Sequence, residues 1–253
     1  MKYILGILST FILTFINLQA QEATTVPVEN EFKVIETSEE ELSQENITPA
    51  SPYCFEVANQ FNEPKCQPTC CSTVPFQLAL FSPLQTSSRL TSVRGVRVNL
   101  LYGDNVNVSG LDIGLLNTAQ GDVTGLEIGF INNITGDFSG LQLGAVNSVQ
   151  GNFYGIQRGF VNITEGNFYG IQDGWVNVTF GKFHGLQGGW LNYSKHMNGV
   201  QVGLVNVTSC RTSGVQFGLV NYTQSLAGIQ IGLLNIQTNR TYVKALPIVN
   251  MNF

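Results

Sequence analysis

Residues 155–184 read GIQRGFVNITEGNFY and then GIQDGWVNVTFGKFH, which is one phrase of fifteen residues written twice. Between residues 95 and 239 the phrase recurs with the consensus G-L-Q-x-G-h-V-N-x-T-x-G-x-F-x, where h is apolar, and we number its places as columns 1 to 15. A spacing this constant indicates one structural unit that is stacked on itself. The copies begin at Gly95, Gly110, Gly125, Gly140, Gly155, Gly170, Gly185, Gly199, Gly214 and Gly228.

Three columns stay apolar over most of the repeat, and we expect them to form the core. Column 2 runs from Val96 to Ile229 and column 7 from Leu101 to Leu234, with no polar residue in either. Column 14 begins at Val108 and holds phenylalanine in four copies before its apolar character weakens. A single copy buries too little apolar surface to offset its ordering entropy, whereas a stacked copy also hydrogen-bonds to both of its neighbours.

The predicted fold is therefore all-β: a β-solenoid of about ten rungs of 14–15 residues, with short and mostly parallel strands. Rungs separated by about 4.8 Å give a rod about 45 Å long. The open strand edges at both ends need covers. We therefore assign residues 53–94 to an N-terminal cap, residues 95–239 to the solenoid and residues 240–253 to a C-terminal capping strand.

Three further columns predict how neighbouring copies touch. Column 8 is asparagine from Asn117 to Asn235. Asparagine tolerates turn conformations, and stacked side-chain amides can hydrogen-bond along the axis. The glycines of columns 1 and 5 predict backbone conformations closed to other residues, or a close approach of neighbouring backbones. We interpret all of these residues as structural.

The N-terminal segments indicate export. Residues 1–20 have the pattern of a signal peptide, in which Lys2 precedes an apolar run from Ile4 to Phe15 and cleavage follows Ala20. Residues 21–52 hold eight glutamates against one lysine, so we expect a disordered acidic tether. Since the whole chain has a net charge of −5, the remainder is close to neutral and has no basic stripe for nucleic acid. No later stretch reaches the length of a transmembrane helix.

Cysteine usage agrees with export. Cys54, Cys66, Cys70 and Cys71 lie together before the repeats, and in an oxidising compartment we expect them to form disulfides in one of three possible pairings. A zinc site is the alternative, but histidine is nearly absent and no paired C-x-x-C is present, so we expect neither a metal nor a cofactor. Cys210 stands alone within the repeats, and we expect it to be buried.

The central copies depart from the consensus in three columns, and their residues are candidates for binding. Aromatic rings beside charges on an exposed strip suit a partner protein or a sugar. The alternative, which we favour, places column 6 inside the solenoid, where large rings fill a wider waist. The candidates are Arg158 and Asp173 in column 4, Phe160, Trp175 and Trp190 in column 6, and Tyr154, Tyr169 and His184 in column 15.

Two pairs of acidic residues occupy the same column in adjacent copies: Asp112 with Glu127, and Asp122 with Asp137. Stacking sets each pair about 4.8 Å apart, near the separation of the two carboxyls in a retaining glycosidase. Any in-register ladder gives that spacing, and no third catalytic partner converges on either pair. We therefore interpret all four as solvated turn carboxylates and expect neither catalytic residues nor a calcium site, which predicts a protein that is not an enzyme.

Entry, repeat and exit segments follow one another in a recognisable order. These are VPFQLALFSPLQ (74–85), VRGVRVNLLYG (93–103), GLDIGLLN (110–117) and a closing LPIVN (246–250). Over about residues 74–253 the chain resembles a family of bacterial surface-repeat proteins described from leptospires. The resemblance implies export and surface exposure, and it brings no established activity or site residues. Many members of that family look like lipoproteins, whereas no cysteine follows the apolar run here.

A weaker resemblance is to curlin, the subunit of bacterial amyloid fibres, whose repeat carries Q-x-G-x-x-N, as in QLGAVN (142–147) here. Curlin repeats are longer, and a cysteine-bearing cap favours a closed monomer. We therefore expect an exported bacterial protein, secreted or held at the cell surface or in the periplasm, with association to the outer membrane left open. Its expected function is non-enzymatic binding of a partner protein or a glycan, or a structural role. A curlin-like fibre subunit and a carbohydrate-active enzyme are the alternatives.

Overall fold

The computed structural model describes residues 72–82, 84–241 and 243–253. The predicted signal peptide, the acidic tether and Cys54, Cys66, Cys70 and Cys71 lie outside the described residues. Cys210 is 3% exposed and so is buried, as expected. In the described part of the chain, no helix has the length and apolar character needed to cross a lipid bilayer.

Every regular element within the described residues is a β-strand, in agreement with the predicted all-β class. The strands are β1 (Thr73–Phe81), β2 (Leu84–Gln85), β3 (Ser92–Asn105), β4 (Val108–Ala119), β5 (Val123–Ile134), β6 (Phe138–Leu143), β7 (Val146–Val149), β8 (Phe153–Thr164), β9 (Phe168–Phe217), β10 (Val220–Gln237) and β11 (Ala245–Asn252).

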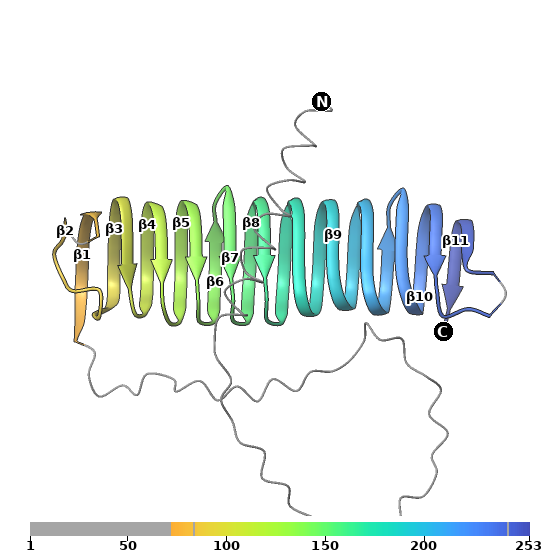
Figure 1. The fold of residues 1–253 in the computed structure, drawn as a ribbon, viewed down its shortest axis with the longest axis horizontal. Helices are drawn as coiled ribbons and strands as arrows, with labels where there is room; N and C mark the ends of the chain where they lie inside the picture. Colours follow the sequence, from red (N-terminus) through yellow and green to blue (C-terminus); the bar gives the residue numbers. More distant parts are fainter. Residues whose placement is uncertain (1–71, 83, 242) are drawn as a thin grey trace, which may run out of the picture. The chain divides into compact units, whose positions relative to one another are not determined.

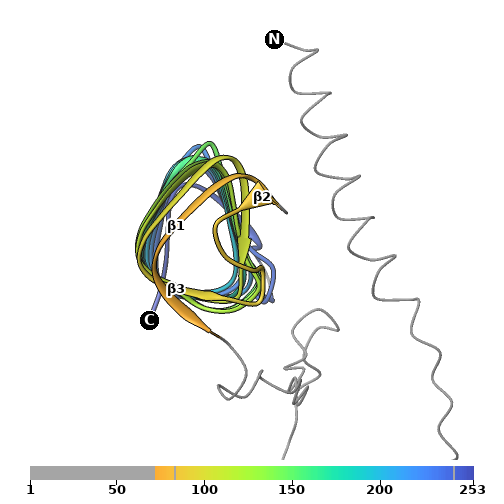
Figure 2. The ribbon, with the colours of Figure 1, turned by 90° about the vertical axis from the view of Figure 1, so that its left-hand side faces the viewer.

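The strands coil into a β-solenoid of about 11 turns, which confirms the fold predicted from the repeat. From β1 and β3 to β9 and β10, neighbouring coils pair in parallel. The register is the repeat itself, since Gly110 pairs with Gly125 and Asn162 pairs with Asn177. Figure 1 shows the coils side by side along the long axis, from β1 and β2 at one end to β11 at the other. Figure 2 shows that the coils superpose around one closed cross-section.

Column 1 requires glycine because of both its backbone conformation and its surroundings. Each glycine of this column has a φ between 127° and 148°, a region that residues with side chains disfavour. A Cβ at Gly125 would overlap the backbone carbonyl oxygen of Gly110 in the preceding coil, and the same clash recurs along the column. Neighbouring coils therefore approach each other through backbone atoms at this point, as expected.

Column 14 forms the apolar core, as predicted. Phe138, Phe153, Phe168 and Phe183 are fully buried, and successive rings stack with their centroids 4.7–5.0 Å apart. Column 10 faces the same interior, and Ile134 in that column is also fully buried. One column of rings thus runs through the central coils at the spacing of the strands.

Columns 2 and 7 are not core, and this part of the sequence-based expectation is wrong. Val96, Ile156 and Leu186 in column 2 are 37%, 41% and 51% exposed, and Leu101 in column 7 is 49% exposed, although Val176 in column 7 is buried. Successive side chains of a strand point to opposite faces. Because columns 3, 8, 10 and 14 point into the solenoid, columns 2 and 7 point outward. Apolar side chains therefore cover much of the outer surface, and polar side chains fill the interior in their place.

Two ladders of side-chain amides occupy that interior. From Asn117 to Asn221, each column 8 asparagine donates its Nδ2 to the Oδ1 of the asparagine in the next coil, at 2.8–3.0 Å, as expected for stacked amides. From Gln157 to Gln230, each column 3 glutamine donates its Nε2 to the Oε1 of the glutamine before it, at 2.7–2.8 Å. Buried amides are tolerated because they have partners. The glutamine ladder was not predicted from the sequence.

The glutamine ladder ends in three buried charged residues, so Asp112 and Glu127 are not the solvated carboxylates that we expected. Column 3 faces inward, and Arg97, Asp112 and Glu127 are at most 1% exposed. Arg97 Nε donates to Asp112 Oδ1 at 2.8 Å, and Arg97 Nη2 donates to Asp112 Oδ2. Glu127 Oε2 accepts a hydrogen bond from Gln142 Nε2 at 2.7 Å. Burial, with the negative charge of Asp112 as the second cause, raises the pKa of Glu127 to about 8.

Glu127→Gln is expected to stabilise the protein at neutral and alkaline pH. The folded-state pKa of Glu127, about 8, lies above its ordinary value of 4.5, so the folded protein retains a proton that the unfolded chain releases. The free energy of unfolding therefore falls as the pH rises from 4.5 through 8, by at most about 1.4 kcal/mol per pH unit. Glutamine does not titrate and can continue the ladder. Urea unfolding at about pH 5 and about pH 8 measures the difference; an unchanged pH dependence in the variant would contradict a buried, protonated Glu127.

The strands at the two ends run against the direction of the coils. β2 pairs antiparallel with β1, and β11 pairs antiparallel with β10. β11 also closes the glutamine ladder, because Asn250 Nδ2 donates to Gln230 Oε1 at 2.7 Å. Other side chains of this end remain in solvent: Ile248 is 70% exposed and Phe253 is 93% exposed.

Candidate binding groove

A groove follows the outside of the solenoid between columns 4 and 6, and we call it the column 4/6 groove. The two columns flank column 5, which is glycine in all copies but the first. A Cβ at Gly174 would lie 2.6 Å from Asn162 Nδ2 and 3.0 Å from Asn177 Oδ1. Glycine therefore keeps the floor of the groove low and leaves room for the asparagine ladder beneath it.

The groove encloses about 720 Å³ over the central coils. Phe160 and Trp175 are each 53% exposed, and Trp190 is 59% exposed. The expectation that column 6 packs inward is therefore wrong, because column 6 lies at the corner of the coil and points into solvent. Five of the predicted binding residues lie on the walls here: Arg158, Phe160, Asp173, Trp175 and Trp190.

The column 6 rings form a stack that runs along the rod. Trp175 and Trp190 have ring centroids 5.2 Å apart and planes inclined by 5°. Phe160 and Trp175 have centroids 4.8 Å apart and planes inclined by 50°. Nearly parallel rings at this separation cover one another's inner faces. An apolar partner lying along the groove can contact the exposed parts of the rings, whereas a sugar ring that stacks on an aromatic face finds the inner faces already covered.

The central part of the groove carries an exposed ion pair. Arg158 Nε lies 2.9 Å from Asp173 Oδ2, and the two side chains are 67% and 47% exposed. An ion pair this exposed contributes little to the stability of the fold, so both side chains can form new ion pairs with a partner protein. The backbone beneath is engaged in other bonds, since the carbonyl oxygen of Arg158 accepts from Gly144 N at 3.1 Å and from Asn147 Nδ2 at 2.9 Å. Recognition in the groove therefore depends on side chains.

The other three predicted binding residues form a separate stack in column 15. Tyr154 and Tyr169 have ring centroids 5.1 Å apart, and Tyr169 and His184 have centroids 4.9 Å apart. None of the three lines the column 4/6 groove. The structure thus does not bring them together with Trp175 and Trp190, because column 15 lies on the strand that precedes the corner.

The same groove continues over the C-terminal coils with mostly aliphatic walls, which sequence reasoning missed. It encloses about 400 Å³ there. Leu204, Leu219 and Leu233, all in column 6, are 49%, 50% and 72% exposed. The signal was visible in the sequence, since column 6 is apolar in every copy while its neighbour in column 5 is glycine in nearly all of them. The apolar side chains that line this part are Leu204, Phe217, Leu219, Ile231, Leu233 and Ile248.

Both acidic pairs have structural roles. Asp122 Oδ1 accepts the backbone N–H of Asp137 at 2.9 Å, and Asp137 Oδ1 accepts the backbone N–H of Asn152 at 2.7 Å. These bonds tie each turn to the next coil, as a turn carboxylate can. Asp112 and Glu127 belong to the buried glutamine ladder. Among the described residues, no three His, Cys, Asp or Glu side chains gather in a way that could hold a metal ion.

Comparisons of the chain with protein-family models, with curated proteins and with solved structures found no match. The functional assignment therefore depends on the chemistry and geometry of the column 4/6 groove.

Proposed function

We propose that the protein is an exported, non-enzymatic binding module that holds a partner protein in the column 4/6 groove. The observation that carries the proposal is the placement of three large exposed rings, Phe160, Trp175 and Trp190, along one wall of an open groove. Extended apolar patches on a protein surface mark interaction sites. The predicted signal peptide and the resemblance to bacterial surface-repeat proteins support a location at the cell surface or in the periplasm.

A partner protein suits this groove better than a glycan does. Sugars are bound against free aromatic faces, and the faces of Trp175 and Trp190 are turned toward each other. Protein interfaces combine an apolar centre with tryptophan and arginine anchors and a polar rim. The column 6 rings with Arg158 and Asp173 beside them have this composition, and the aliphatic continuation of the groove extends the apolar area.

Trp175→Ala combined with Trp190→Ala is expected to weaken partner binding by at least about tenfold, because anchors of this kind carry most of the energy of an interface. The chain has two tryptophans and both lie in the groove, so the double variant removes every indole and alters this surface alone. The full-length protein is screened against an array of host extracellular proteins and glycans. The affinity for each hit is then measured by isothermal titration calorimetry with the unaltered protein and with the double variant, and saturable binding that the double variant weakens supports binding in the groove.

The matched control is Tyr154→Ala combined with Tyr169→Ala, which removes another stacked pair, with centroids 5.1 Å apart, from outside the groove. This variant should bind as the unaltered protein does. An equal loss of affinity in both double variants, or no loss in the tryptophan variant, would contradict the groove as the binding site. Hits confined to glycans would move the assignment to carbohydrate recognition.

A curlin-like fibre subunit is the second candidate, and the C-terminal edge strand favours it. Ile248 and Met251 of β11 are 70% and 55% exposed, and an apolar edge strand is a template for pairing with another chain. Seeded growth of dye-positive fibres from the purified protein would support this function. A monomer that persists at high concentration would remove it.

A further inference from the structure

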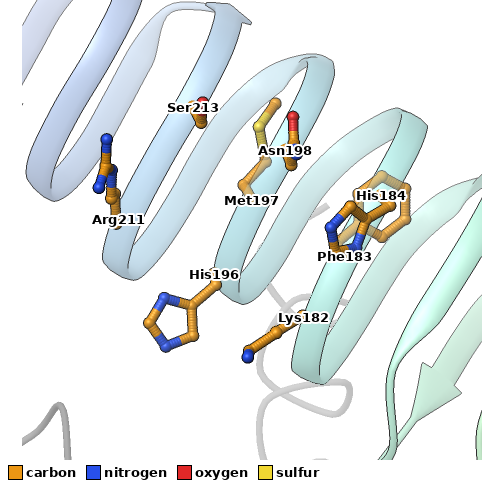
Figure 3. A pocket seen from close by; sticks show the side chains of 8 residues that line it. All are labelled: Lys182, Phe183, His184, His196, Met197, Asn198, Arg211 and Ser213. Atoms are coloured by element: carbon orange, nitrogen blue, oxygen red, sulfur yellow. The ribbon is translucent and has the colours of Figure 1, made fainter.

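Two coils have 14 residues instead of 15, at 185–198 and 214–227, and a pocket lies beside the first of them. Residues 185–198 form a coil of 14 residues between coils of 15 at 170–184 and 199–213. The buried column 14 residues Phe183, Met197 and Thr212 mark the same point in the three coils, which places the missing residue in the preceding turn. Figure 3 shows side chains of these coils around a pocket of about 180 Å³.

Column 13 changes its chemistry at this pocket. In the five coils from residue 95 to residue 169 it holds Asn or Asp. The side chain there accepts a backbone N–H from the next coil, as Asn152 Oδ1 does from Asn167 N at 3.0 Å. In three successive coils it then holds Lys182, His196 and Arg211. Three neighbouring coils therefore carry a basic side chain at the same place.

The side chains that line the pocket include four basic ones, and no Asp or Glu of the described residues is among them. His184 is held by its stacking on Tyr169, with ring centroids 4.9 Å apart, and its Nδ1 is buried without a hydrogen-bond partner. Residues with nitrogen and hydroxyl groups line the pocket on both of its sides, in columns 13 and 15. The polar lining residues are Lys182, His184, His196, Asn198, Arg211 and Ser213.

We propose that this pocket binds a tetrahedral oxyanion, the phosphate or sulfate group of a ligand. Arginine binds such groups through two parallel hydrogen bonds, lysine binds them as a point charge, and imidazole, amide and hydroxyl groups supply further donors. The pocket lies in columns 13–15 and shares no lining residue with the column 4/6 groove, so it does not depend on the function proposed for that groove.

Histidine NMR spectra test the pocket directly, because the chain has two histidines and both line it. The full-length protein, purified without a histidine tag, is titrated with sodium phosphate and separately with sodium sulfate. Sodium chloride at matched ionic strength is the reference. The expected result is a saturable shift of both imidazole signals with phosphate or sulfate and none with chloride, and the stronger of the two anions identifies the kind of ligand group.

Lys182→Asn and Arg211→Asn remove the cations while keeping a residue that column 13 carries in earlier coils, as at Asn152 and Asn167. Each variant is expected to bind the oxyanion about tenfold more weakly, which is the effect of losing one charge-assisted hydrogen bond. Arg94→Gln removes an exposed charge from the first coil, outside the pocket, and should leave the affinity unchanged. Shifts that fail to saturate, or an affinity that Arg211→Asn and Arg94→Gln alter equally, would overturn the proposal.

Discussion

Gly170→Ala is expected to lower the free energy of unfolding by more than about 3 kcal/mol, or to prevent the solenoid from folding. Gly170 has a φ of +137°, and a Cβ at this position would overlap the backbone carbonyl oxygen of Gly155. Both glycines are fixed by the pairing of β8 with β9, so neither backbone can move aside without opening the sheet. Urea unfolding followed by circular dichroism measures the effect.

Gly188→Ala is the matched control, because it adds the same methyl group in the next coil. A Cβ at Gly188 would have Asp173 Oδ1 as its nearest neighbour, at 3.6 Å, which is ordinary contact. We expect a change within about 1 kcal/mol, in the stabilising direction, since alanine restricts the unfolded chain more than glycine does. Equal stabilities of the Gly170 and Gly188 variants would show that column 1 does not need glycine.

Asn177→Leu is expected to destabilise the protein by about 2–5 kcal/mol, because it interrupts the asparagine ladder in the middle of the stack. Asn177 accepts from Asn162 Nδ2 at 2.8 Å, and it donates to Asn192 Oδ1 at 2.9 Å and to the Gly188 carbonyl oxygen at 2.7 Å. Leucine has a similar size but leaves these buried groups without a partner. The same urea unfolding experiment gives the difference in free energy.

Asn198→Leu provides the comparison for the ladder variant. Asn198 is an exposed asparagine of column 15, and its replacement makes the same chemical change outside the interior. Exposed substitutions of this kind usually alter the free energy of unfolding by less than about 0.5 kcal/mol. A similar loss of stability in the Asn177 and Asn198 variants would mean that the amide ladder does not hold the coils together.

The stacked coil could be predicted from the sequence because residues that are one repeat apart pair directly with each other in neighbouring coils. Glycine in column 1 and asparagine in column 8 recur at positions that pair directly with each other, as Gly110 with Gly125. The side of the strand that faces inward could not be predicted in the same way. Apolar residues such as Val96 are normally placed inside and glutamines such as Gln172 outside. Here the arrangement is reversed, because each buried amide finds its partner in another coil and a single copy of the repeat does not contain that bond.

The groove and the oxyanion pocket were predictable to different degrees. Trp175 and Arg158 drew notice as departures from the repeat, but their exposure depends on the corner at column 5, which a linear pattern does not define. Tyr154 was grouped with them although column 15 lies on a different part of the coil. The pocket beside residues 185–198 was missed, even though the shortened copy and the change of column 13 to Lys182 were both visible. Only the stacking of coils gives those two features a common location.

The amide ladders, the groove and the pocket all require coils that lie directly over one another, and distances between spin labels test this stacking most directly. Ser109, Tyr169 and Asn198 are exposed residues of column 15, separated in turn by four coils and by two coils. Nitroxide-bearing amino acids at these positions, measured in pairs by pulsed electron spin resonance, should lie about 19 Å apart for Ser109 with Tyr169 and about 29 Å apart for Ser109 with Asn198. The predicted result is a distance that grows linearly with the number of coils. Distances that stay constant or alternate along the chain, as they would if neighbouring copies ran in opposite directions, would contradict the stacked solenoid.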